Sequence, residues 1–194
     1  MRSENLPLPW GQDPAAAAQR MRDDALSVVR HKSARYSVRH PLLIGALLAG
    51  MAPSSPTAKH LAEFGEEIGI AFQLRDDELG VFGSPRVTGK PAGDDLREGK
   101  RTVLLALAWG RCDDTGRKLL GSVLANTETT SNQIAEASAL IEDCGARAVH
   151  EEIIATHRDA GVRALGRLRD EGVVSTASLE DLVELADLLT HRDS

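Results

Sequence analysis

The sequence predicts an all-α fold, and three observations carry this prediction. Of the 194 residues, 42% are hydrophobic but only 3% are aromatic, so the core must be built mainly from Leu, Ala, Ile and Val. Leu and Ala are good helix formers. Apolar residues recur at helical spacing in most of the chain, and no segment has a convincing strand pattern. A chain of this length is expected to bury a core as one domain.

The N-terminal region is expected to contain a short leader and then helix. Residues 1–13 are polar and contain prolines, which favours a disordered leader, so the helical domain is expected over residues 14–194. Pro14 suits a first helical turn, and Asp13 can act as its N-cap. We therefore expect the first helix to begin at Pro14.

Prolines and glycines divide the rest of the chain into further helices. The first helix is expected to run to about Arg39, where Pro41 ends it and opens an apolar helix to about Ala52. A long helix should then end near Phe82, before a glycine-rich loop. Thr130 has capping-box spacing to Gln133 and should begin a helix. The later helices are expected over residues 96–110, 114–125, 131–144, 146–171 and 178–190.

Composition and charge exclude several classes of function. A net charge of −6 with few aromatic residues is a poor match to a nucleic-acid-binding protein, which needs basic stripes and stacking platforms. The longest apolar run, Pro41 to Gly50, is too short to span a bilayer, and the N-terminus lacks the apolar stretch of a signal peptide. Cys112 and Cys144 match no zinc or redox spacing. We expect a soluble, cytoplasmic protein.

The segment FQLRDDELG carries the first chemical signal. On a helix, Gln73, Asp76, Asp77 and Gly80 are spaced three or four residues apart and are expected on one face. Adjacent carboxylates repel each other and invite a cation, and oxygen ligands favour Mg²⁺ over zinc. Two adjacent aspartates taken alone are more typical of a solvated helix face.

The loop after this helix supplies the complementary charge. Its glycines, Gly83, Gly89 and Gly93, allow backbone N–H groups to approach an anion. Lys90 and Lys100 add positive charge. The ordered combination of paired aspartates, glycine-rich loop and lysines predicts a diphosphate held between Mg²⁺ and ammonium groups, rather than an ordinary charged loop.

These segments resemble a known family. The stretch from Phe72 to Thr102 resembles the second aspartate-rich region of trans-prenyl diphosphate synthases, the polyprenyl synthetase family, and is most similar to its geranylgeranyl diphosphate synthases. Upstream, HKSARYSVRHPLLIGALLAG (residues 31–50) resembles the Lys-Thr-x-x-Tyr helix of the family and the Pro-x-x-x-Gly helix after it. Two separate motifs in the right order make the resemblance specific.

The resemblance implies a fold, a reaction and roles for particular residues. It implies a helical bundle around a central cavity, and Mg²⁺-dependent condensation of an allylic diphosphate with isopentenyl diphosphate. By resemblance, Asp76 and Asp77 belong to the metal site. The residues expected to hold the allylic diphosphate or line its site are Lys32, Ser33, Tyr36, Gln73, Lys90 and Lys100, and the roles expected to be catalytic fall on Asp76, Asp77, Lys32 and Lys90.

The sequence departs from the family pattern in two places. The full second motif is Asp-Asp-x-x-Asp, but Gly80 stands at its third position. The first aspartate-rich motif of the family, expected before Lys32, is absent, because the nearest candidate, DDALS, has Ser27 in the third place. The chain therefore resembles the C-terminal portion of a synthase, without the N-terminal helices.

Two functional hypotheses remain open at this point. One is a prenyl diphosphate synthase that retains the allylic-diphosphate half of the site. The other is a non-catalytic relative or subunit that packs against a full-length synthase, and in either case we expect a homo-oligomer or a partner chain. A metalloprotease is excluded, because HEEIIATH places Ile154 where the motif His-Glu-x-x-His needs its second histidine. His150 and His157 are expected at exposed helix positions.

Overall fold

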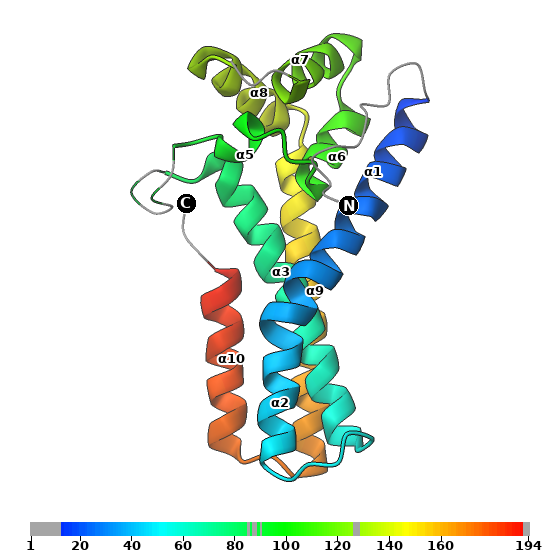
Figure 1. Ribbon diagram of the computed structural model, residues 1–194, viewed down its shortest axis with the longest axis vertical. Coiled ribbons are helices and arrows are strands. Elements are labelled where there is room, and N and C mark those ends of the chain that lie inside the picture. The colour runs from blue at the N-terminus through cyan, green and yellow to red at the C-terminus, as the bar shows by residue number, and fades with distance from the viewer. Residues whose placement is uncertain (1–12, 85, 87–88, 90, 126–128, 192–194) are drawn as a thin grey trace. The chain divides into compact units, whose positions relative to one another are not determined.

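The structure is a computed structural model that describes residues 13–84, 86, 89, 91–125 and 129–191, and these residues contain helices and no strand (Figure 1). The all-α prediction is thus confirmed. None of the helices in the described ranges is long and apolar enough to cross a membrane. The elements are α1 (Pro14–Val28), the π-helix η2 (Val29–Arg39), α2 (His40–Leu48), α3 (Pro56–Phe82), α5 (Asp94–Arg97), α6 (Val103–Arg111), α7 (Asp114–Ala125), α8 (Ser131–Asp143), α9 (Ala146–Glu171) and α10 (Thr176–Thr190).

The chain divides into two compact units. Among the described residues, the first unit comprises those in 13–27 and 76–152, and the second comprises residues 28–75 and 153–191. Helices α3 and α9 each contribute residues to both units. Each unit has a hydrophobic core of its own.

The core of the first unit is formed by the short helices in the middle of the chain. Leu104 and Trp109 of α6 pack there with Leu120 of α7 and Ile141 of α8, all nearly inaccessible to solvent. Leu96 of α5 joins the same cluster. This core anchors the end of α3 and the segment after it, which carry the aspartate-rich region.

The core of the second unit lies between long helices. Helices α2, α3, α9 and α10 run beside one another here (Figure 1). Phe64 and Ile68 of α3 pack with Leu168 of α9 and Ala186 of α10, and Leu42 of α2 lies against them. Glycines bring α3 very close to η2: a Cβ on Gly69 would lie 2.6 Å from the Cα of Ala34, and one on Gly65 would lie 2.8 Å from the Cα of Arg39. Larger residues at these two positions would push the π-helix away from α3.

The prediction that Pro41 ends a helix is wrong, because the chain stays helical from α1 through η2 into α2. Pro41 lies in the first turn of α2, where its missing N–H costs little. Just before it, the wider π-helical turn leads the His40 N–H to donate to the carbonyl of Arg35, five residues earlier. The change of hydrogen-bond register at the proline lets the helical path continue.

The expected helix over residues 96–110 is also wrong, because α5 ends at Arg97 and α6 begins only at Val103. Gly99 has a positive φ of 68°, which stops α5, and the Thr102 side chain accepts a hydrogen bond from the N–H of Leu105 and caps α6.

Both predicted N-caps are present. The Asp13 side chain accepts from the N–H of Ala16, and Thr130 forms the capping box with Gln133. The predicted leader falls, apart from Asp13, outside the described residues, so the division into residues 1–13 and 14–194 remains a prediction.

Candidate functional site

The paired aspartates lie near the end of α3 but differ in environment. Asp76 is exposed, whereas Asp77 is buried, with 8% of its surface accessible. Successive residues of a helix point about 100° apart, which separates the two carboxylates. Gln73, one turn earlier on the same helix, is half-buried. Asp76 is therefore the carboxylate best placed to meet a ligand from solvent.

The donors at this end of α3 fit Mg²⁺ better than a soft metal. Within the described residues, no cluster of three or more His, Cys, Asp or Glu side chains is placed to hold a metal alone. Mg²⁺ commonly takes only one or two carboxylates from a protein and completes its octahedron with water and phosphate oxygens. The exposed carboxylate of Asp76 can supply one such ligand.

Asp95 brings the start and the end of the aspartate-rich region together within the first unit. Lys100 donates a hydrogen bond through Nζ to Oδ1 of Asp95, and its Nζ lies 3.0 Å from Oε2 of Glu98. Burial raises the pKa of Asp95, Lys100 opposes that shift, and the charge of Asp76 adds to it. The charge of Asp76 therefore disfavours the ionised form of Asp95, and Asp95 in turn contacts the ammonium of Lys100.

The charge of Lys100 is stabilised by its two acidic neighbours. Burial acts to lower the pKa of Lys100, but the hydrogen bonds and charges of Asp95 and Glu98 outweigh it and raise the pKa above its ordinary value. The side chain is therefore a cation throughout the physiological pH range, and it remains 31% exposed.

In the second unit, the π-helix η2 holds the residues that resemble the Lys-Thr-x-x-Tyr motif. Lys32 and Tyr36 are exposed, Tyr36 with 75% of its surface accessible, and Ser33 is half-buried. π-helical turns are rare and occur frequently at functional sites. The sequence of residues 29–39 has no pattern that distinguishes a π-helix from an α-helix.

Basic side chains gather along the same helix. The Glu66 carboxylate of α3 accepts two hydrogen bonds from the guanidinium of Arg35. They join Nε to Oε2 at 3.2 Å and Nη2 to Oε1 at 3.3 Å. Arg30 lies 3.2 Å and Arg39 3.6 Å from the same carboxylate. One carboxylate therefore meets three guanidinium groups, which leaves this side of η2 with excess positive charge that suits an anionic ligand.

The second unit also contains a pocket of about 880 Å³. Residues of η2, α2, α3 and α10 line it, and most of these residues are apolar. The lining residues are Ser37, Val38, Pro41, Leu42, Gly45, Ala46, Met51, Leu61, Phe72, Val174, Ser178, Asp181, Leu182, Leu185 and Leu189. Pockets that hold drug-sized ligands have volumes of about 300–1,000 Å³.

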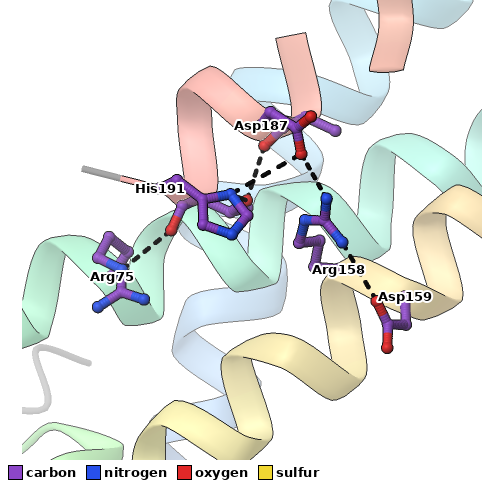
Figure 2. A network of polar contacts seen from close by, with 7 residues as sticks. Arg75, Arg158, Asp159, Asp187 and His191 are labelled. Carbon is purple, nitrogen blue, oxygen red and sulfur yellow. Dashed lines mark hydrogen bonds and ion pairs between the residues drawn. The ribbon is translucent and has the colours of Figure 1, made fainter. Parts of the chain in front are cut away.

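Polar contacts fix the C-terminal end of α10, which forms part of this pocket. The Nε of Arg75 donates to the carbonyl of Thr190 at 3.0 Å, and Asp187 contacts both Arg158 and, at 3.8 Å, the ring of His191 (Figure 2). These contacts attach α10 to α3 and α9 within the second unit.

Three site-related expectations need comment. Lys90 lies outside the described residues. The expectation that His150 is exposed is wrong: its side chain is completely buried in α9, while His157 is partly buried and its Nδ1 lies 2.7 Å from Oε2 of Glu67. The amphipathic pattern of α9 had signalled a helix but not which histidine faces the core.

Arg101 is a candidate that sequence reasoning missed. In the part of the chain that the structure describes, its buried Nε has no hydrogen-bond partner, and burial lowers the pKa of its guanidinium. Its position directly after Lys100 was the available signal.

Curated relatives of the chain are prenyl diphosphate synthases. It is 38% identical over 123 residues to a geranylfarnesyl diphosphate synthase from Aeropyrum pernix, covering 63% of this chain and 36% of that protein. It is 34% identical over 154 residues to a (2E,6E)-farnesyl diphosphate synthase from Mycobacterium bovis, covering 78% of this chain and 41% of that protein. The chain thus spans less than half the length of these relatives.

Solved structures agree with this relationship. The chain matches a geranylgeranyl pyrophosphate synthase from Corynebacterium glutamicum, crystallised with isoprenyl diphosphate and magnesium, with 36% identity and a TM-score of 0.81. The match covers 93% of this chain and 52% of that one. A polyprenyl synthase from Caulobacter crescentus matches at 27% identity with a TM-score of 0.75, over 92% of this chain and 58% of that one.

The sequence profile of one family covers most of the chain. The Polyprenyl synthetase profile matches residues 4–141, which include both segments of the resemblance. The chain therefore belongs to the polyprenyl synthetase family.

Proposed function

We propose that the chain acts in prenyl transfer, as a prenyl diphosphate synthase portion that binds an allylic diphosphate through Mg²⁺. The reaction is the condensation of that substrate with isopentenyl diphosphate, in isoprenoid biosynthesis. Membership of the polyprenyl synthetase family supports the reaction class. The proposal includes a cytoplasmic location, which the sequence suggested.

The observation that carries the proposal lies in the first unit: the Asp95 carboxylate lies against Gly80, one helical turn after Asp76, and accepts a hydrogen bond from Lys100. A carboxylate suited to Mg²⁺ and a stable cation suited to a diphosphate oxygen come from opposite ends of one motif. That pairing of charges is what a departing diphosphate requires, because stabilisation of its developing charge must be preorganised.

Each residue has a role that its chemistry supports. Asp76, assisted by Asp77, would hold Mg²⁺, which supplies charge to the leaving diphosphate when bound. Lys32, Lys90 and Lys100 would bind the diphosphate oxygens. Gln73, Ser33 and Tyr36 would contact the substrate through hydrogen bonds or by lining its site.

The apolar pocket of the second unit has a lining that suits a prenyl chain. Its lining offers Leu, Val, Phe and Met side chains and few polar groups. A hydrocarbon chain gains by leaving water for such a surface. A prenyl chain is therefore a ligand whose chemistry suits this pocket.

Exposed apolar side chains support a partner. Ile44 of α2 lies three and four residues before Leu47 and Leu48, and all three are exposed, Leu48 with 84% of its surface accessible. Exposed apolar residues that share one helix face can form a patch of the kind that marks an interaction site. We propose that a second copy or a synthase chain covers it.

The alternative of a non-catalytic relative is not favoured, because the matching relatives are named as synthases.

Thermal unfolding tests the proposal. Geranyl diphosphate with Mg²⁺ is expected to raise the Tm, because a ligand that binds only the folded chain stabilises it. Inorganic diphosphate with Mg²⁺ should raise the Tm less, since it lacks the hydrocarbon chain, and geraniol should raise it least. No shift with geranyl diphosphate at millimolar concentration would contradict the proposal.

A further inference from the structure

Gly80 occupies an unusual position for a glycine. It lies inside α3, two residues before the end, and its φ is not in the left-handed region. Glycine is the poorest helix former after proline, so an ordinary helical position gains nothing from it. Packing must therefore explain its presence.

The space beside Gly80 is filled by Asp95. A Cβ on Gly80 would lie 2.3 Å from both Cγ and Oδ2 of Asp95, and 2.9 Å from its Oδ1. These three atoms of one carboxylate are the nearest neighbours that an added Cβ would meet. A side chain of any size at position 80 would have to displace the carboxylate of Asp95.

The backbone after α5 fixes Lys100 against the same carboxylate. The N–H of Gly99 donates to the carbonyl of Leu96 at 3.1 Å, and the N–H of Lys100 donates to the carbonyl of Asp95 at 3.0 Å. With Gly99 at positive φ, these bonds form a Schellman motif, which places the side chains of Asp95 and Lys100 next to each other. A hydrophobic contact usually joins these two positions, but here an ion pair does.

We propose that Gly80 and Asp95 are positioning residues for Lys100: the missing Cβ at position 80 admits the Asp95 carboxylate, which holds the Lys100 ammonium in place. Glu98, which is 50% exposed, contributes a second and more exposed contact. The role of Lys100 toward a diphosphate rests on the proposed function, but the coupling among these three residues does not.

The coupling explains the departure at the third position of the aspartate-rich motif. A carboxylate on residue 80 and the Asp95–Lys100 pair would compete for one space. In this chain the two arrangements exclude each other, so Gly80→Asp is expected to disrupt Lys100 rather than to add a metal ligand.

Lysine acylation measures the position of Lys100 directly. With limiting acetic acid N-hydroxysuccinimide ester and peptide mass spectrometry, Lys100 should react several-fold faster, relative to exposed Lys118, in Gly80→Ala and in Asp95→Ala than in the unchanged chain. The matched control is Gly166→Ala in α9, where an added Cβ would meet nothing within 4 Å. Equal Lys100 reactivity in Gly80→Ala and Gly166→Ala would overturn the proposal.

A double-mutant cycle shows whether Gly80 acts through Asp95. In the unchanged chain, Gly80→Ala should lower the Tm, whereas Gly166→Ala should raise it or leave it unchanged, because alanine favours helix. In the Asp95→Ala background the clash is gone, so Gly80→Ala should no longer lower the Tm and should not change Lys100 reactivity further. This comparison decides the question even if Gly80→Ala alone fails to fold. The same loss of Tm in both backgrounds would contradict the proposal.

Addition of inorganic diphosphate with Mg²⁺ separates this inference from the proposed function. Protection of Lys100 from acylation by Mg²⁺-diphosphate is expected if Lys100 binds the ligand. If acylation is unaffected while the Gly80 and Asp95 effects persist, the positioning role stands and the diphosphate role of Lys100 is wrong. If protection occurs but the Gly80 effects are absent, the diphosphate role of Lys100 stands and the positioning role of Gly80 is wrong.

Discussion

The Nε of Arg147 lies 2.7 Å from Oε1 of Glu78, a carboxylate that is only 2% exposed and that directly follows the aspartate pair of α3. The guanidinium also covers the ring of Phe82 at 4.4 Å and lies 3.0 Å from Oε2 of Glu142. Within the first unit, the start of α9 thus holds the end of α3 in place. This contact lies one residue after the aspartate pair proposed to bind Mg²⁺.

The first prediction follows from the burial of Glu78. Arg147→Met should lower the free energy of unfolding by about 3 kcal/mol, because it removes the guanidinium partner of a buried carboxylate. Glu142→Gln is the matched control, since this partner is 54% exposed and should cost less than about 1 kcal/mol. Urea unfolding followed by circular dichroism measures both. Equal losses for the two variants would contradict the assignment.

The second prediction concerns the three arginines on Glu66 in the second unit. Glu66→Gln removes the negative charge that contacts Arg30, Arg35 and Arg39, so the mutual repulsion of these arginines should lower the free energy of unfolding by about 1 kcal/mol. The loss should shrink as salt is raised from low concentration to 1 M, because salt screens exposed charges. Glu180→Gln, at an exposed position of α10, is the control and should have almost no effect. A salt-independent loss would show that packing, not charge, is responsible.

The third prediction uses pH. Burial, with the neighbouring Cys144 thiol, raises the pKa of Cys112 to about 12. The folded chain therefore holds a proton that the unfolded chain loses, so this contribution to stability is complete below the ordinary thiol pKa and is lost as pH rises toward 12. At pH 8.5, iodoacetamide should alkylate Cys112 more slowly than the partly exposed Cys144, and urea should abolish the difference. Equal native rates would be inconsistent with this burial.

Sequence patterns predicted the helices where apolar spacing and caps agree. The capping box at Thr130, the Asp13 cap and the end of α3 at Phe82 were all visible as local signals. The prediction at Pro41 was wrong because the hydrogen-bond register changes in η2, where Ala34 packs closely on Gly69. No local sequence pattern reveals this change or this packing.

The candidate site was predictable in composition but not in arrangement. The motif indicated Asp76 and Lys100 together, since both follow from the order of charges along the chain. The role of Gly80 was not predictable, because the space it leaves is filled by a residue from a different segment. Gly99 and Thr102 did carry a readable signal, a glycine stop followed by a threonine cap, which divides residues 96–110 into two elements.

The fourth prediction is that the 194-residue chain alone makes no detectable prenyl diphosphate. The family's first aspartate-rich motif is not among these residues, so part of the metal site and the basic pocket for isopentenyl diphosphate have no side chains here. The assay combines labelled isopentenyl diphosphate, an allylic primer and Mg²⁺, followed by extraction of products. Multiple-turnover elongation by the purified chain would show that other residues replace the missing carboxylates.

Calorimetric titration with geranyl diphosphate tests the central claim most directly. We expect affinity that depends on Mg²⁺ and is lost or much weaker in EDTA, because without a bound cation the Asp76 carboxylate repels the diphosphate. Asp76→Asn and Lys100→Met should each weaken the Mg²⁺-dependent binding by about tenfold or more, the loss expected for one charge-assisted contact, while Lys118→Met leaves it unchanged. The same affinity with Mg²⁺ and with EDTA, or no binding with Mg²⁺, would contradict the proposal that this chain holds an allylic diphosphate through its aspartate-rich region.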